Sequence, residues 1–219
     1  MTKSLLIAWQ TANKLALVIG GGSVAYSRVR KLLDAEARVR VVSPTLEKEL
    51  SDLETEIEYV ARKFVDSDLD DEISMVLVAI DDHQESSRIY KLCKERGVPV
   101  NVADVPEECD FYFGANYDDG PLQVLVSTNG ESPGMASYLG KYIASHLPPH
   151  VRETIEMFGE MRRRLRSRFP GPEHSKFRMR LMKKLTQEYR ESDPSTVDID
   201  GVLDKYTTES LNEQHPTRP

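Results

Sequence analysis

Four carboxylates lie close together in the segment PVNVADVPEECDFYFGAN, where an apolar run gives way to aromatic residues. They are Asp104, Glu107, Glu108 and Asp110. Asp104 directly follows a predicted strand, and in open α/β sheets the ligand crevice lies outside the carboxyl ends of the strands. This position suits a general base that takes a proton from a bound substrate. The alternative is an aspartate that only turns the chain before Pro106.

The other three carboxylates have simpler explanations. Glu107 and Glu108 come one and two positions after Pro106, where we expect solvated residues of a turn. Asp110 precedes the aromatic residues, and we expect it to cap a backbone group or to form a local ion pair. Asp104 is therefore the candidate catalytic residue of the segment.

A glycine turn near the start of the chain indicates a dinucleotide site. Residues 20–25, GGGSVA, fit the pattern G-x-G-x-x-A directly after the apolar run KLALVI. In this pattern glycines permit a tight turn and close approach of a pyrophosphate, and the N–H groups that open the next helix face the phosphates. The alternative is a glycine turn without a ligand. The candidate cofactor-binding residues here are Gly20, Gly22, Ser23 and Val24.

Two further segments are expected to border the same cofactor. The second predicted strand closes at Ser43, Pro44 and Thr45, where an acidic residue or an arginine cluster would distinguish NAD from NADP. Because no arginine cluster is present, the segment favours NAD. Asp81 follows the fourth strand at the same crevice, although it is equally well explained, with Asp82, as part of a helix N-cap.

Alternation of apolar strands with amphipathic helices predicts the fold that positions these residues. Such alternation is typical of right-handed βαβ units and a parallel, doubly wound sheet. The strands are expected at 14–19, 37–44, 56–62, 74–80 and 98–103, with a helix at 83–97.

The pattern changes after about residue 104. We expect two strands joined by a turn at 118–121, a helix at 132–147 and a boundary at Pro148-Pro149. Charged helices are expected at 151–168, 172–191 and 194–206, followed by a disordered polar tail, NEQHPTRP. The sequence thus predicts an α/β fold with three parts, 1–115 for the cofactor, 116–148 in the middle and a helical 149–219.

Composition narrows the class of protein. The 219 residues carry a formal net charge of −7, which argues against nucleic-acid binding. No run approaches the roughly 20 apolar residues of a membrane span, and the early polar residues argue against a signal peptide, so we expect a cytoplasmic protein. The cysteines, Cys93 and Cys109, form no CxxC pair, and the histidines show no ligand spacing. We therefore name no metal ligand.

Four strings in register make the chain resemble the precorrin-2 dehydrogenase family, the dehydrogenase/ferrochelatase module of siroheme synthase and its stand-alone yeast-type relatives. They are LVIGGGSVAYSRVRKLL, VRVVSP, NVADVPEECDFYFGAN and VSTNGESPGMAS. The resemblance covers about residues 1–148. It implies a Rossmann NAD domain, a small α+β dimerisation domain that makes a homodimer, and a helical C-terminal domain. One departure is Glu36, where the family often turns with glycine, so we expect a changed loop there.

The resemblance also implies a reaction. The family oxidises precorrin-2 to sirohydrochlorin with NAD, and some members insert ferrous iron, as a substrate, to give siroheme. Its catalytic aspartate, implicated in both reactions, falls on Asp104, and a serine near the substrate pocket falls on Ser132. Ser132 also fits a helix N-cap. Asn101 and Asn116 are further candidates for hydrogen bonds to the tetrapyrrole.

The substrate, which carries eight carboxylates, suggests a role for a basic helix. Arginines in MRRRLRSRF could clamp carboxylates, although consecutive residues cannot share one helix face and a solvated face is the alternative. These arginines are Arg162, Arg163, Arg164, Arg166 and Arg168. Two other functions remain open, an NAD(H)-sensing regulatory module without catalysis and a family relative that only binds tetrapyrrole.

Overall fold

The computed structural model describes residues 4–214, and the side chains of residues 4–208. The chain divides into two compact units, with the boundary between Phe113 and Gly114. Each unit has its own core and is considered separately.

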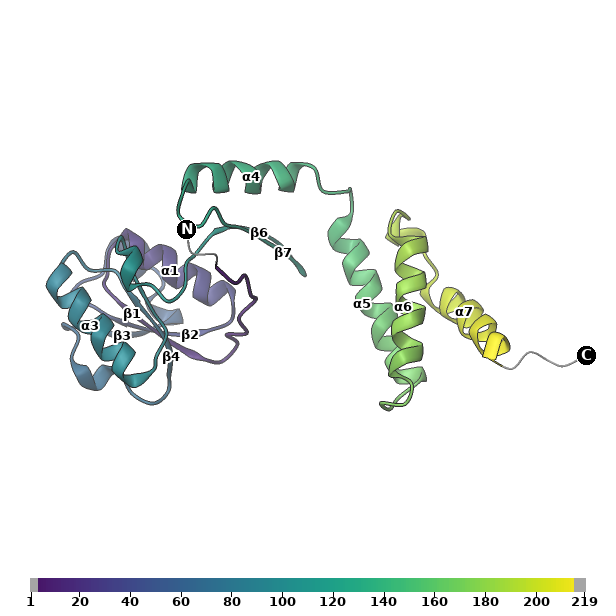
Figure 1. Ribbon diagram of the computed structural model, residues 1–219, viewed down its shortest axis with the longest axis horizontal. Coiled ribbons are helices and arrows are strands. Elements are labelled where there is room, and N and C mark those ends of the chain that lie inside the picture. The colour runs from purple at the N-terminus through teal and green to yellow at the C-terminus, as the bar shows by residue number, and fades with distance from the viewer. Residues whose placement is uncertain (1–3, 215–219) are drawn as a thin grey trace, which may run out of the picture. The chain divides into compact units, whose positions relative to one another are not determined.

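The first unit is built on a parallel sheet of five strands in the order β3-β2-β1-β4-β5 (Figure 1). The strands are β1 (Leu15–Ile19), β2 (Arg38–Val42), β3 (Glu58–Val60), β4 (Ile73–Val78) and β5 (Val100–Val102). Every residue of β1 is buried, because the central strand of a parallel sheet is covered on both faces. The strand order reverses between β1 and β4, and ligands of such sheets bind at that point. The predicted α/β class is confirmed.

Helices on the two faces of the sheet account for the alternating contacts of β1. Ala16 and Val18 pack with Val29 of α1 (Ser23–Asp34), whereas Leu17 packs with Ile89 of α3 (His83–Arg96). Short helical segments lie between β2 and β3, between β3 and β4, and after β5. They are α2 (Lys48–Ser51), η1 (Glu54–Glu56), η2 (Asp66–Asp68) and η3 (Pro106–Glu108).

The loop between α1 and β2 keeps a left-handed turn without glycine. Glu36 adopts φ 59°, and the amide of Ala37 donates to the carbonyl of Leu32 across the helix end. This is the arrangement that glycine commonly provides after a helix. Glu36 thus adopts a backbone conformation that glycine favours, and a loop changed from that of the family stays a prediction.

The second unit begins with an antiparallel hairpin covered by one helix. Strands β6 (Ala115–Asp119) and β7 (Leu122–Val126) are joined at Gly120, whose φ of 58° suits a tight turn. Helix α4 (Pro133–Ser145) lies against the hairpin through Ala136 and Gly140, which are buried.

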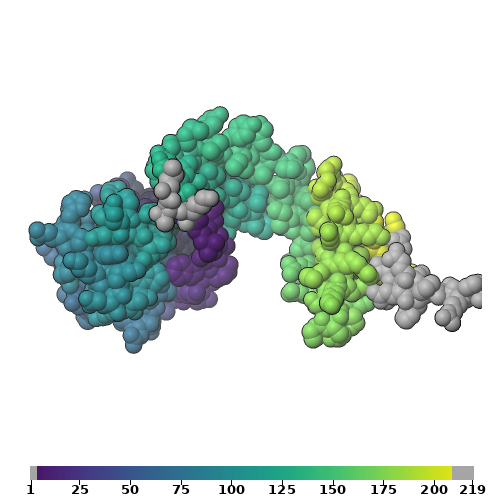
Figure 2. Space-filling model, viewed as in Figure 1, coloured from purple at the N-terminus to yellow at the C-terminus, as the bar shows by residue number. Residues whose placement is uncertain are grey.

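Three further helices form a separate hydrophobic cluster in this unit. They are α5 (Val151–Arg168), α6 (Ser175–Tyr189) and α7 (Ile199–Gln214), with a short η4 (Pro194–Thr196) before the last. Met161, Leu165, Leu181, Leu185 and Leu203 are buried among them. Figure 2 shows the side chains of α5 and α6 in contact at the surface of this cluster. The helix expected at 194–206 is interrupted because Asp193 caps the η4 turn, and the helix resumes at Ile199.

The expected disordered tail is wrong in part. Helix α7 continues to Gln214, so the backbone of residues 212–214 is helical, and the rest of that segment lies outside the described residues. Among the helices that the structure describes, none combines the length and apolar character needed to cross a membrane.

Candidate functional site

The three consecutive glycines after β1 have three different environments. Gly20 has φ 127°, and a Cβ there would lie 2.1 Å from the carbonyl oxygen of Ala79. A Cβ at Gly21 would lie 1.9 Å from the carbonyl oxygen of Thr45. A Cβ at Gly22 would meet nothing nearer than 3.6 Å. The first two glycines therefore allow the chain to pack, whereas Gly22 leaves its backbone open to a ligand.

The glycine turn places the N-terminus of α1 at the carboxyl end of β1. Gly22 is the N-cap residue of α1 and provides no side-chain cap, so the first N–H groups of the helix remain available to an anion. Ser23 and Val24 follow and are exposed, while Ala25 is fully buried against the sheet. This arrangement fits the pyrophosphate of a dinucleotide.

The segment after β2 supports the glycine turn from one side. Ser43 is buried, and its hydroxyl donates to the carbonyl oxygen of Thr45 at 2.7 Å. The amide of Glu47 donates to the carbonyl oxygen of Gly21 at 2.8 Å. Pro44 and Thr45 are exposed. The hydroxyl of Ser43 therefore orders the loop, and the exposed positions of this segment are those that could reach a ribose.

The two aspartates after β4 have separate roles. Asp82 is the N-cap of α3, since its Oδ1 accepts from the amide of Glu85 at 3.0 Å. Asp81 is exposed, and within the described part of the chain it makes no hydrogen bond or ion pair. Only Asp82 belongs to the expected cap, which leaves Asp81 available at the cofactor edge.

Asp104 lies two residues beyond β5 in a left-handed conformation, with φ 61°. A non-glycine residue with positive φ is uncommon, although aspartate is among the types that tolerate it. The residue is exposed. A solvent-accessible carboxylate at the carboxyl end of a parallel strand can accept a proton from a substrate bound over that edge.

A cation that the sequence prediction did not single out lies within electrostatic range of this carboxylate. The guanidinium of Arg28 is 4.4 Å from the ring centroid of Phe113, and it interacts electrostatically with Asp104 and Cys109. Burial lowers the pKa of Arg28. One sequence signal could have found it, because Arg28 lies four residues after Val24 on the helix that starts at the glycine turn.

Asn101, at the middle of β5, has local hydrogen-bond partners. Its side chain is buried, and its amide nitrogen donates to the carbonyl oxygen of Phe111 at 2.8 Å. The same nitrogen lies 3.3 Å from the Sγ of Cys109, whose thiol donates to the carbonyl oxygen of Val102. Burial raises the pKa of Cys109. These local partners satisfy the buried amide, and contact with a substrate stays a prediction for Asn101.

Two of the other three acidic residues of the segment are tied to the fold. Glu108, expected to be solvated, is half-buried and accepts from the hydroxyl of Ser87 at 2.7 Å. Glu107 is exposed, as expected. Asp110 accepts from the amide of Val100 at 3.2 Å, which is a cap of a backbone group as expected, and it pairs with Lys94 of α3 at 2.6 Å.

Two predicted substrate residues lie in the second unit. Asn116 is exposed on β6. Ser132 is the N-cap of α4, and its Oγ accepts from the amide of Met135 at 3.4 Å. The capping alternative for Ser132 is therefore observed, and contact with a substrate stays a prediction for both residues.

The basic segment of α5 separates into three groups. Arg164 and Arg168 form ion pairs with Asp200 at 2.6 and 2.9 Å, so they join α5 to α7. Arg163 pairs with Glu160 at 2.8 Å on the surface. Arg162 and Arg166 instead line a groove between α5 and α6. Within the described residues, no group of three His, Cys, Asp or Glu side chains could hold a metal ion.

Three family models match the chain in succession. The model described as "Putative NAD(P)-binding" matches residues 7–115. The models described as "Sirohaem biosynthesis protein central" and "Sirohaem biosynthesis protein C-terminal" match residues 119–146 and 148–212. The glycine turn and Asp104 both lie in the first match.

Two curated relatives from yeasts match the chain over most of its length. The siroheme biosynthesis protein of Schizosaccharomyces pombe is 48% identical over 183 residues, which cover 82% of this chain and 69% of that protein. The siroheme biosynthesis protein of Saccharomyces cerevisiae is 33% identical, with coverage of 94% and 90%. The siroheme synthase of Thioalkalivibrio sulfidiphilus is 39% identical, but the match spans only 33% of that longer protein.

A solved structure shares the fold along almost the whole chain. The structure of SirC, precorrin-2 dehydrogenase, superposes with a TM-score of 0.71 and covers 94% of this chain and 100% of its own. Sequence identity is 21%, so this likeness is one of fold.

Proposed function

Because the chain belongs to the siroheme biosynthesis protein family, we propose that it oxidises precorrin-2 to sirohydrochlorin with NAD⁺ and then inserts ferrous iron to give siroheme. One observation carries the proposal. In a single compact unit, an open glycine turn after β1 and a solvent-accessible aspartate after β5 lie at the carboxyl edge of the same parallel sheet. That edge is where such a sheet binds its ligands.

The glycine turn fits the cofactor. Gly22 and the N-terminus of α1 would hold the pyrophosphate, because no Cβ and no capping side chain blocks those N–H groups. The exposed Thr45 and Asp81 would border the rest of the nucleotide. When bound, NAD⁺ supplies a hydride acceptor. We favour NAD over NADP because the segment after β2 presents no arginine cluster for a 2′-phosphate.

Asp104 is the proposed general base. Oxidation of precorrin-2 removes a hydride and a proton, so that precorrin-2 and NAD⁺ give sirohydrochlorin, NADH and H⁺. The hydride goes to the nicotinamide and the proton to the carboxylate of Asp104. In the second reaction, the same carboxylate would accept pyrrole protons as ferrous iron, a substrate, replaces them. Arg28, half-buried against Phe113, would add a positive charge to the site that faces the carboxylates of the substrate.

The proposed assembly is a homodimer formed through α4 and β7. Large apolar side chains are exposed on these two elements of the second unit, and such a patch commonly marks a protein interface. They are Leu125, Met135, Tyr138, Tyr142 and Ile143.

The test is a two-step assay with the purified chain. Precorrin-2 and NAD⁺ are supplied first, and the absorbances of NADH and sirohydrochlorin are followed together. Ferrous ion is then added anaerobically, and the conversion to siroheme is measured. Equal amounts of NADH and sirohydrochlorin, followed by siroheme, are expected. Absence of NADH with the wild-type chain would contradict the proposal, whereas NADH without siroheme would limit it to the dehydrogenase.

A further inference from the structure

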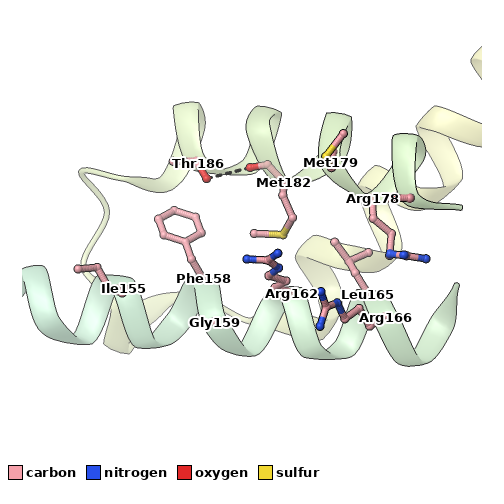
Figure 3. A pocket seen from close by; sticks show the side chains of 11 residues that line it. Ile155, Phe158, Gly159, Arg162, Leu165, Arg166, Arg178, Met179, Met182 and Thr186 are labelled. Carbon is pink, nitrogen blue, oxygen red and sulfur yellow. Dashed lines mark hydrogen bonds between the residues drawn. The ribbon is translucent and has the colours of Figure 1, made fainter. Parts of the chain in front are cut away.

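A groove of about 640 Å³ runs between α5 and α6 of the helical region (Figure 3). Its walls are largely apolar. Phe158 on α5 and Met182 on α6 extend into the space between the two helices, and Leu165 and Met179 also line the groove. Met179 is 66% exposed, so one wall is open to solvent. Volumes of about 300–1,000 Å³ are typical of sites for small organic ligands.

The charge of the groove has one sign. Arg162 and Arg166, spaced four residues apart on α5, line the groove, and Arg178 lines it from α6 (Figure 3). Within the described residues neither Arg162 nor Arg166 makes an ion pair or a hydrogen bond, and no acidic side chain lines the groove. The guanidinium of Arg178 donates to the carbonyl oxygens of Phe169 and Gly171, which bring no compensating charge.

The neighbouring arginines of α5 do form ion pairs, so the absence of a partner at Arg162 and Arg166 among the described residues is specific to the groove. Arg164 and Arg168 use their charge to bind Asp200 on α7, and Arg163 pairs with Glu160. Folding thus neutralises three arginines of the run and leaves the two at groove positions without a carboxylate. A ligand that brings carboxylates to an apolar surface would complement both properties.

We propose that this groove binds a carboxylated tetrapyrrole, with Arg162 and Arg166 pairing with carboxylates at its periphery and Phe158 and Met182 contacting the ring. The inference rests on the proposed function, which supplies a flat macrocycle bearing eight carboxylates. Guanidinium groups bind carboxylates through two parallel hydrogen bonds, and methionine side chains adapt to a planar ligand. The groove belongs to a different compact unit from Asp104, so it adds a tetrapyrrole contact that the NAD-binding unit does not contain.

The experiment measures equilibrium binding of sirohydrochlorin to the full chain by its absorbance change, without NAD and without turnover. The test variant is R162A/R166A. The matched control is R163A/R180A, which removes the same charge from exposed positions outside the groove. We expect the dissociation constant to rise at least tenfold in R162A/R166A and to stay within about twofold of wild type in the control. The variant R162K/R166K, which keeps the charge, should recover part of the affinity.

The outcomes separate this inference from the proposed function. The inference is overturned if R162A/R166A binds sirohydrochlorin as tightly as wild type does. The two arginines would then serve another acidic ligand, such as a peptide. Equal losses in the test variant and the control also overturn it, because they show a general effect of net charge. No binding by wild type overturns it as well. Failure of the proposed function is a different result, the absence of NADH in the two-step assay. Thermal unfolding of each variant, expected within a few degrees of wild type, shows that the fold is intact.

Discussion

Replacement of Gly22 by alanine is expected to weaken NAD binding without unfolding the protein. The φ of Gly22 is −91°, which alanine adopts without strain, and the added Cβ would lie 3.6 Å from the nearest side-chain atom. Alanine is a poorer N-cap than glycine by roughly 0.5–1 kcal/mol, and reduced freedom of the unfolded chain returns about 0.4–1 kcal/mol. The free energy of unfolding should therefore change by less than about 1 kcal/mol.

The adjacent glycine provides the contrast. A Cβ at Gly21 would lie 1.9 Å from the carbonyl oxygen of Thr45 and 2.7 Å from the hydroxyl of Ser43, so backbone must move. Overpacking of this kind costs about 1–3 kcal/mol, and we expect Gly21→Ala to fall at the upper end of that range or beyond it. The two substitutions are one position apart, but Gly22→Ala should weaken NAD binding, whereas Gly21→Ala should lower the stability of the fold.

Two measurements check this contrast. Urea unfolding followed by circular dichroism gives the free energy of unfolding, and titration with NADH followed by fluorescence gives the dissociation constant. Gly22→Ala should retain wild-type stability and lose at least about tenfold in NADH affinity, which corresponds to about 1.4 kcal/mol. Wild-type NADH affinity in Gly22→Ala, or wild-type stability in Gly21→Ala, would refute the assignment of the open and the packed glycine.

Three further outcomes are expected. Asp68, buried and paired with Arg62 at 2.6 Å, has its pKa lowered by that hydrogen bond. Asp68→Asn should therefore lower the free energy of unfolding by about 1–3 kcal/mol above about pH 5. The difference between this variant and wild type should shrink as the pH falls through about 4, where the carboxyl of the unfolded chain titrates. A difference in urea unfolding that does not depend on pH would contradict this. Burial raises the pKa of Cys93 to about 11, so at pH 8 its thiol should react with a disulfide reagent only at a rate limited by unfolding. Rapid reaction of both thiols of the chain would contradict the burial of Cys93. The double variant of Tyr138 and Tyr142 to serine should sediment as a monomer if α4 forms the proposed homodimer, and an unchanged sedimentation coefficient would exclude that face.

The sequence was sufficient to predict the sheet because its strands are short apolar runs that end at polar or glycine residues. The run LALVI is buried along its whole length, and Gly97 ends α3 in a left-handed conformation, as a helix-terminating glycine should. Boundaries in the helical region were less predictable. The cap at Asp193 interrupts the last helix because a side-chain hydrogen bond to the backbone competes locally with helix formation.

The site was predictable only where backbone geometry determines it. The glycine pattern located the cofactor turn, but the pattern does not say which glycine contacts Thr45 and which remains open, since that depends on the loop after β2. Asn101 was assigned to the crevice from its strand position, whereas its side chain points into the fold and bonds Phe111. Glu108 is held by Ser87 on α3, a contact between residues 21 positions apart that no local pattern reveals.

Turnover by Asp104→Asn tests the central claim most directly. Asparagine tolerates the left-handed backbone at this position and preserves the size of the side chain, but it cannot accept a proton as a carboxylate does. With precorrin-2 and NAD⁺ at saturation, we expect kcat for NADH formation to fall by about 10²–10⁴, while NADH affinity and the unfolding curve stay those of wild type. An undiminished kcat in Asp104→Asn would contradict the assignment of Asp104 as the general base.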